Sequence, residues 1–191
     1  VLQASRSIER SDIVVLLIDA ERGVGEQDAK IAGLANDRGR ALVLALNKVD
    51  LLSREDQKRA MDRAREILAF VPWAPMVTVS AMKGTGVSAL LSRIEDAVVE
   101  HRKRITTGEL NRFFEEVLER HPPPTMHHRP VRLNFITQVS VAPPSFVIIT
   151  NEPKGVHFSY QRYVVNQIRK RFGFRGTPIR VFYRAKNKKK R

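Results

Sequence analysis

The first hundred residues alternate between short apolar runs and longer amphipathic stretches. Ile13–Ile18 and Ala41–Leu46 carry only apolar side chains, which is typical of strands buried on both faces of a parallel sheet. A shorter run at Met76–Val79 predicts a third strand. Helices are expected between and after these strands, over residues 26–38, 53–71 and 87–104, with Ser53 as the N-cap of the second and Asp56 three residues on. This alternation predicts an α/β domain over residues 1–104, with helices packed on a parallel sheet.

A different order of elements begins near residue 105. Residues 107–120 form an amphipathic pattern that ends at three consecutive prolines, which cannot continue a helix. Strands are expected over 131–141 and 145–150, then a helix over 159–172 with Ser159 as its N-cap, and a strand over 179–183. The order α-β-β-α-β predicts an α+β domain over residues 105–185. Residues 186–191 hold five basic side chains and no apolar one, so we expect a disordered basic tail.

Charge separates the two regions more sharply than composition does. Residues 1–105 contain 17 Lys and Arg against 15 Asp and Glu, whereas residues 106–191 contain 17 against 5. Nearly all of the net charge of +14 therefore belongs to the second region. A domain this basic usually faces phosphates, although a merely solvated basic surface is the simpler alternative.

A tetrad that could read guanine directly follows the second apolar run: Asn47, Lys48, Val49 and Asp50. In open α/β sheets, ligands bind outside the carboxyl ends of the strands, where this tetrad is expected to lie. The Asp50 carboxylate would accept hydrogen bonds from the ring N1–H and the exocyclic amino group of guanine, which adenine does not offer in that arrangement. Asn47 would tie the loop to its neighbours, and Lys48 would lie along the base and ribose.

A second short motif, Ser80-Ala81, follows the third predicted strand about 30 residues after the tetrad. A turn at this place would present backbone N–H groups to the guanine O6. Together the two motifs predict the base-recognition half of a Ras-like P-loop GTPase domain. The phosphate-handling half has no counterpart, because the sequence contains no G-x-x-x-x-G-K-[ST] and no candidates for the Mg²⁺ ligands or for positioning an attacking water. We therefore expect no catalytic residue, no hydrolysis by this chain alone, and weak nucleotide binding.

The missing strand of a Ras-like sheet has a structural consequence. Without it, Ile13–Ile18 becomes an exposed apolar edge, which proteins rarely leave uncovered. The expectation from sequence is that the chain is a truncated, proteolysed or partly ordered portion of a longer protein, or that another chain completes the sheet.

Over essentially all 191 residues, the chain resembles the C-terminal part of the bacterial EngA/Der tandem GTPases. The resemblance implies the back half of a second GTPase domain followed by a KH-like domain, with GTP or GDP as cofactor and Mg²⁺ in the intact protein. It also implies a cytoplasmic role in maturation of the large ribosomal subunit, with ribosomal RNA and the N-terminal GTPase domain as partners. Beyond the two motifs above, it rests on residues 7–12, 23–28, 84–86, 143–146, 158–163 and 172–180.

Two assignments in the basic region have alternatives. Gly173-Phe174-Arg175-Gly176 looks like the G-x-x-G that clamps RNA backbone in KH domains, but such a loop joins two helices and here a strand follows. The favoured interpretation is structural, with Gly173 capping the helix in the left-handed conformation and Gly176 turning the chain. The candidates for RNA phosphate contact, each alternatively a solvated surface residue, are Arg162, Arg169, Lys170, Arg171, Lys188, Lys189 and Lys190.

Other classes of function have little support in the sequence. There is no cysteine, and His127-His128 has no third ligand at metal spacing, so we expect no metal site. No apolar run approaches the roughly 18–20 residues needed to span a bilayer. The alternative to a ribosome-assembly GTPase is an RNA- or ribosome-binding module in which the GTPase remnant is a scaffold without nucleotide activity.

Overall fold

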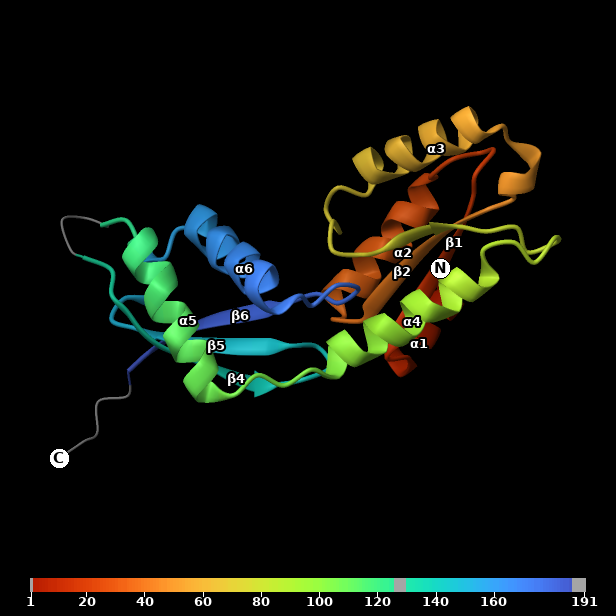
Figure 1. Ribbon diagram of the computed structural model, residues 1–191. Coiled ribbons are helices and arrows are strands. Elements are labelled where there is room, and N and C mark those ends of the chain that lie inside the picture. The colour runs from red at the N-terminus through yellow and green to blue at the C-terminus, as the bar shows by residue number, and fades with distance from the viewer. Residues whose placement is uncertain (1, 126–129, 187–191) are drawn as a thin grey trace. The chain divides into compact units, whose positions relative to one another are not determined.

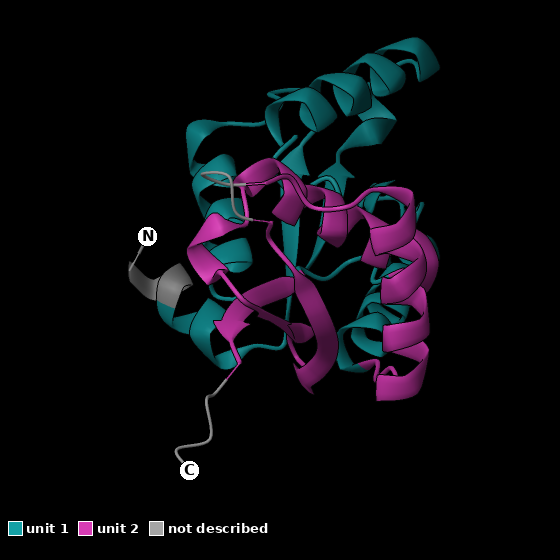
Figure 2. Cartoon of the chain, turned by 90° about the vertical axis from the view of Figure 1, so that its left-hand side faces the viewer, with its two compact units in different colours: residues 1–102, 174–178 teal, residues 103–173, 179–191 magenta. Residues whose placement is uncertain are grey.

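The computed structural model describes residues 2–125 and 130–186, which divide into two compact units (Figure 2). The first unit is built from residues up to 102 together with residues 174–178, and the second from residues 103–173 and from 179 onward. The short segment 174–178 therefore packs with the GTPase-like region, although the sequence pattern placed it in the basic domain.

A three-stranded parallel sheet forms the centre of the first unit. Its strands are β1 (Ile13–Asp19), β2 (Ala41–Asn47) and β3 (Met76–Thr78), in the order β1-β2-β3. This confirms the predicted parallel sheet. The prediction that the first strand lies at the edge is also confirmed, and Leu17 on it is 52% exposed.

Helices and a 3₁₀ turn surround this sheet (Figure 1). Ser53 is the N-cap of α3 as predicted, because its hydroxyl accepts a hydrogen bond from the Asp56 N–H at 3.1 Å. The helix at the N-terminal end was not predicted, and the predicted ends at Val71 and Arg104 were too late. The elements are α1 (Leu2–Arg10), α2 (Glu26–Asp37), η1 (Val49–Leu51), α3 (Arg54–Ile67) and α4 (Val87–Arg102).

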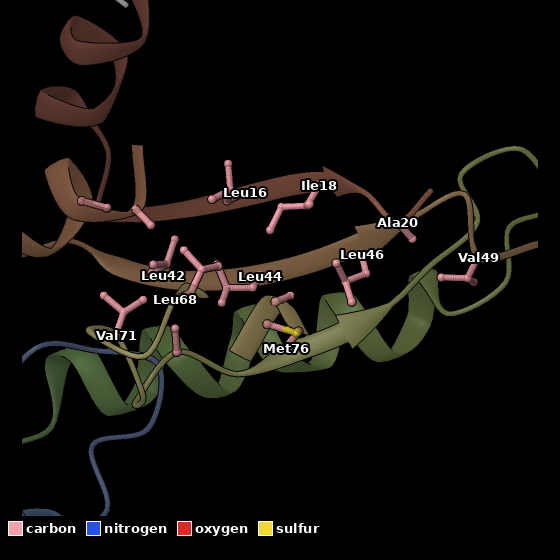
Figure 3. Packing of buried hydrophobic residues seen from close by; sticks show 14 residues of the cluster. Leu16, Ile18, Ala20, Leu42, Leu44, Leu46, Val49, Leu68, Val71 and Met76 are labelled. Atoms are coloured by element: carbon pink, nitrogen blue, oxygen red, sulfur yellow. The ribbon is translucent and has the colours of Figure 1, made fainter. Parts of the chain in front are cut away.

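Both faces of the central strand are buried, as its apolar sequence predicts. Leu42, Leu44 and Leu46 point into the larger cluster with Ile18 and Met76 (Figure 3). The alternate residues Ala41 and Val43 pack with Ala97 of α4 on the other face. Burial on both faces fixes the register of β2 and therefore the position at which the strand ends and the following loop begins.

The inserted segment 174–178 is held by backbone contacts within the first unit. The Leu42 N–H donates to the Gly176 carbonyl at 2.9 Å, and the Gly176 N–H donates to the Trp73 carbonyl at 2.8 Å. A Cβ on Gly176 would lie 2.6 Å from the Cβ of Ala97, so the chain passes α4 too closely for any other residue. Phe174 and Thr177 are fully buried beside it.

The second unit has the predicted order α-β-β-α-β and a three-stranded sheet of order β4-β5-β6. Strands β4 and β5 are antiparallel, and β5 and β6 are parallel. Helices α5 and α6 lie on the same face of this sheet (Figure 1), and Phe113 meets Phe172 edge to face at 5.0 Å. The elements are α5 (Thr107–Arg120), β4 (Leu133–Ser140), β5 (Ser145–Thr150), η2 (Pro153–Gly155), α6 (Phe158–Phe172) and β6 (Arg180–Ala185).

Two predictions at the ends of α6 were wrong. The N-cap is His157 rather than Ser159, because the imidazole Nδ1 accepts the Ser159 N–H at 3.3 Å and the helix already begins at Phe158. Gly173 does end the helix, with φ 88° and ψ −101°, but this is not the left-handed helical conformation expected of it.

Candidate nucleotide-binding site and basic surface

The polar residues singled out in the sequence converge at the carboxyl ends of the first unit's strands. Asp19 and Asn47 are the last residues of β1 and β2 and are paired in register. Chain exits from neighbouring parallel strands meet at one edge of a sheet. The loop beginning at Asn47 and the loop beginning at Ser80 therefore lie beside each other.

Asn47 joins the two loops directly. Its side-chain oxygen accepts the Ala81 backbone N–H at 3.0 Å, across 34 residues of sequence. This is the tying role predicted for Asn47. It also means that the Ala81 N–H, expected to face a guanine O6, already has a partner.

Asp50 is joined to the same neighbouring loop through Ser80. The Ser80 hydroxyl donates to the Asp50 carboxylate, and this hydrogen bond is the main reason that the Asp50 pKa is lowered. Ser80 is 1% exposed, and its oxygen also accepts the Lys83 N–H at 3.2 Å. Lys83 Nζ lies 3.9 Å from the Asp50 carboxylate, whose side chain is 11% exposed. Asp50 is therefore an ionised acceptor held at the sheet edge with part of its surface open.

Lys48 is anchored to the end of the neighbouring strand. Its Nζ lies 2.7 Å from the Asp19 carboxylate, and the hydrogen bond between them lowers the pKa of Asp19 and raises that of Lys48. Lys48 has φ 65° and ψ 28°, a left-handed conformation that is uncommon for a residue other than glycine. Such backbone strain is found most often at binding and catalytic loops.

The 80–86 loop has a fixed shape that depends on a close backbone approach. Ser80 and Thr85 form an antiparallel bridge, with the Ser80 N–H donating to the Thr85 carbonyl at 2.9 Å. Gly86 has φ 77°, and a Cβ on it would lie 2.2 Å from the carbonyl oxygen of Thr78. The glycine thus lets α4 start directly against the end of β3 and sets the position of Ser80 and Ala81.

Sequence reasoning missed one member of this cluster, Asp19. Its carboxylate accepts the Glu21 N–H at 3.0 Å while it pairs with Lys48, so it shapes two loops at once. The signal that could have found it is its position, because packing poorly explains an Asp at the end of a buried strand whose neighbour in the sheet leads into the 47–50 tetrad.

The helix cations proposed for RNA contact do not form one surface. Arg162, Lys170 and Arg171 are exposed on α6, whereas burial lowers the pKa of the half-buried Arg169 to about 10. Arg162 and Arg171 are nine residues apart, which at about 100° per residue places them on opposite sides of the helix. Lys188, Lys189 and Lys190 lie outside the described residues.

Within residues 2–125 and 130–186, no group of three or more His, Cys, Asp or Glu side chains could hold a metal ion. The His127-His128 pair lies outside that part of the chain. No helix in the described ranges combines the length and apolar character that crossing a membrane requires.

Comparison with known proteins defines the class first. Residues 1–100 match the elongation factor Tu GTP-binding domain family, so the first unit belongs to the P-loop GTPase fold class. Residues 104–184 match the KH-domain-like family of EngA bacterial GTPase enzymes, C-terminal. The chain belongs to the EngA/Der family of bacterial GTPases.

Two curated relatives show how much of the family's length is covered. The GTPase Der of Citrifermentans bemidjiense is 42% identical over 99% of this chain and 43% of its own length. That of Moorella thermoacetica is 43% identical over 96% of this chain and 42% of its own length. The chain thus spans less than half of the relatives that it matches.

Among solved structures, translation elongation factor SelB from Methanococcus maripaludis has a TM-score of 0.48 at 18% identity, covering 55% of this chain and 24% of that chain.

Proposed function

We propose that the first unit recognises the guanine base of GTP or GDP through Asn47, Lys48, Val49, Asp50, Ser80 and Ala81. The observation that carries this proposal is the double connection between the two loops, Asn47 to Ala81 and Ser80 to Asp50. Both connections hold side chains in place before a ligand arrives, and such preorganisation reduces the cost of binding.

Base selection falls to the Asp50 carboxylate. An ionised carboxylate has about four lone-pair sites, and Ser80 occupies only part of that capacity. The guanine N1–H and exocyclic amino group would take adjacent sites, whereas adenine would leave them unpaired. Asp50 is ionised at neutral pH, and its lowered pKa extends this ionisation further into acid, so recognition should weaken only when the carboxyl becomes protonated at low pH.

The other members of the two loops position the base. The Val49 side chain is 6% exposed and packs in the core, so it fixes the loop rather than contacting ligand. Lys48, held by Asp19, would lie along the base and ribose with its aliphatic stem. The Ala81 N–H would reach O6 by sharing its hydrogen between the base and Asn47.

The proposed site covers the guanine base, and no residues are assigned to the phosphates of the nucleotide. The sequence contains no G-x-x-x-x-G-K-[ST], and the described residues offer no cluster suited to Mg²⁺. None of the described residues is therefore proposed as a catalytic residue for GTP hydrolysis. GTP hydrolysis is proposed only for the complete protein.

For the second unit, we propose binding to ribosomal RNA during maturation of the large ribosomal subunit in the cytoplasm, with the N-terminal GTPase domain of the complete protein as a further partner. Family membership and the excess of 17 basic over 5 acidic residues in 106–191 support this proposal. Because phosphate contacts release counterions, binding should fall steeply as salt is raised.

Titration of the full chain with GDP and with ADP, followed by backbone amide NMR shifts, tests the guanine proposal. We expect GDP to move the signals of residues 47–50 and 80–85 and to bind at least about tenfold more tightly than ADP, since charge-assisted hydrogen bonds contribute about 1.5–3 kcal/mol. Asp50→Asn should abolish most of that preference.

Asp62→Asn, an exposed acidic position on α3, is the matched control and should leave the preference unchanged. If GDP moves no signal in either loop at millimolar concentration, the first unit has no base site. The alternative function, an RNA-binding module with a GTPase-like scaffold, would then explain the chain better.

A further inference from the structure

One face of the second unit's sheet is covered by helices and the other is open. Ile136, Phe146 and Ile148 are fully buried on the face where α5 and α6 pack (Figure 1). Strand alternation places the residues between them on the opposite face. We call this surface the open face, and it consists of Phe135, Thr137, Val147, Ile149, Phe182 and Arg184.

The strand register arranges these six side chains in two rows across the sheet. One row runs Thr137–Val147–Phe182, and the next runs Phe135–Ile149–Arg184. Each row has an aliphatic residue of β5 at its centre, flanked by one residue from each outer strand. A hollow of about 820 Å³ is lined by five of these residues, all except Phe182, and also by Val139, Pro153 and Lys186.

The two phenylalanines are exposed to a degree that core packing does not explain. Phe135 is 41% and Phe182 is 45% exposed, on strands that flank the central one. Two strand spacings and one two-residue step separate them by roughly 12 Å. Neighbouring stacked nucleotides are only about 3.4 Å apart, so two rings at this separation suit bases splayed out of a helix rather than a stacked duplex.

The charge around the open face points to a polyanion. Strands β4, β5 and β6 contain no Asp or Glu, and neither does the lining of the hollow. Arg184 on the open face and Lys186 at its margin supply positive charge. Four of the five acidic residues of 106–191 lie on α5, which packs against the other face: Glu109, Glu115, Glu116 and Glu119.

We propose that the open face binds unpaired nucleotides of RNA, with Phe135 and Phe182 stacking on bases and with Arg184 and Lys186 neutralising phosphates. Aromatic rings beside cations, without carboxylates, are the features that single-stranded nucleic acids recognise on a sheet. Exposed apolar residues alone would also suit a protein partner, but the absence of acidic residues from this surface favours a polyanion. The inference rests on the proposed binding of RNA by the second unit and assigns it to a surface other than α6.

Fluorescence anisotropy of the full chain with labelled octauridylate and with a labelled RNA duplex tests the proposal. Phe135→Leu and Phe182→Leu keep apolar bulk but remove the aromatic ring. Each should weaken binding of the single strand about five- to tenfold and leave duplex binding unchanged, because stacking is available only to unpaired bases. Arg184→Met should lower the slope of log affinity against log salt by about 1.

Two matched controls separate the open face from general effects. Phe158→Leu changes a phenylalanine that is 62% exposed at the start of α6, and Arg112→Met removes an exposed arginine on α5. Neither should change the affinity for octauridylate by more than about twofold. Ultraviolet crosslinking of octauridylate followed by peptide mass spectrometry gives an independent readout, with crosslinks expected in residues 133–139 and 180–186.

Several outcomes would overturn the inference. If octauridylate binds with strong salt dependence but the two leucine variants bind like wild type, the open face is not the site, while RNA binding itself stands. Crosslinks confined to α6 would likewise place the RNA site away from the open face. Absence of binding to any RNA would remove both proposals. A wild-type dimer in sedimentation that Phe182→Leu converts to monomer would identify the open face as a self-association surface.

Discussion

The candidate binding sites of the two units lie at different parts of their sheets. In the first unit, β2 is buried on both faces, and the candidate site lies where Asn47 leaves the strand. In the second unit, β4 alternates between buried and exposed positions, and the candidate site lies on the face itself. The central strand of the first sheet has no free face for a ligand, so only the ends of its strands remain. The second sheet has a face that no helix covers.

This difference teaches which residues each kind of site depends on. A site at a sheet edge is built from loops, so it needs glycines, strained backbone and side-chain tethers such as Asn47 and Lys48. A site on a sheet face is built by strand register, so ordinary β residues suffice. Substitutions in loops should therefore damage the first site, and substitutions of exposed strand residues the second.

The largest effect should come from Gly86→Ala. The added Cβ would lie 2.2 Å from the backbone oxygen of Thr78, and the residue has φ 77°. Backbone atoms cannot move aside cheaply, so we expect a loss of about 3 kcal/mol or more in the free energy of unfolding of the first unit. Urea denaturation monitored by Trp73 fluorescence, which reports on the first unit, measures this loss.

Two other glycines sharpen the test. Gly84 has φ 70° but nothing within 4 Å of its would-be Cβ, so Gly84→Ala should cost only the left-handed strain of about 1–2 kcal/mol. In the second unit, a Cβ on Gly155 would lie 2.8 Å from the Glu152 Cγ and 3.1 Å from the Val131 Cγ2, which are side-chain rather than backbone atoms, so Gly155→Ala should cost less than Gly86→Ala. A Gly86→Ala variant no less stable than Gly84→Ala would show that the close approach is not required.

Strand periodicity and local motifs predicted those features of both units that depend only on residues close together in the sequence. The apolar run of β2, the tetrad at its end and the Ser53 cap all depend on neighbouring positions, and the structure has them where the sequence indicated. The α-β-β-α-β order of the second unit followed from the same local patterns. Register then explains the open face, which needs the strand pairing as well as the sequence.

Features that depend on distant residues could not be predicted this way. The pairing of Lys48 with Asp19 joins residues from two strands, and the insertion of Gly176 beside Ala97 joins positions far apart in the chain. His157 was missed as the N-cap of α6 because serine is a preferred N-cap residue and histidine is not, so the nearby Ser159 was chosen instead. In each case a tertiary contact or an unusual side chain decided what local propensity left open.

An intermediate effect should come from acid, through the buried His101 of the first unit. Its Nδ1 lies 2.7 Å from the Thr177 hydroxyl, its Nε2 has no partner among the described residues, and burial lowers its pKa. Because the unfolded chain binds this proton more readily, the stabilising contribution is full above about pH 6.5 and falls as pH drops below that value.

Melting temperatures at pH 7.5 and pH 5.5 measure this effect on the first unit. His101→Gln should reduce the difference between the two temperatures, whatever its effect on absolute stability. His157 caps α6 in the second unit, so His157→Gln is the control and should leave the pH dependence of the first unit's transition unchanged. An unchanged pH dependence in His101→Gln would mean that other groups cause it.

The smallest effects should come from one helix cap in each unit, and they test whether the units are separate in stability. Ser53 caps α3 by accepting the Asp56 N–H at 3.1 Å, and Thr106 caps α5 by accepting the Glu109 N–H at 3.3 Å. Changing either residue to alanine should cost about 1 kcal/mol.

If the two units unfold independently, calorimetry will show two transitions, and each variant will move only one of them. The Ser53→Ala transition should be the one that Trp73 fluorescence follows, since Trp73 belongs to the first unit. If both variants instead shift a single transition equally, the units unfold together. The most direct candidate for that coupling is residues 174–178, because they continue the chain from α6 yet take part in the packing of the first unit.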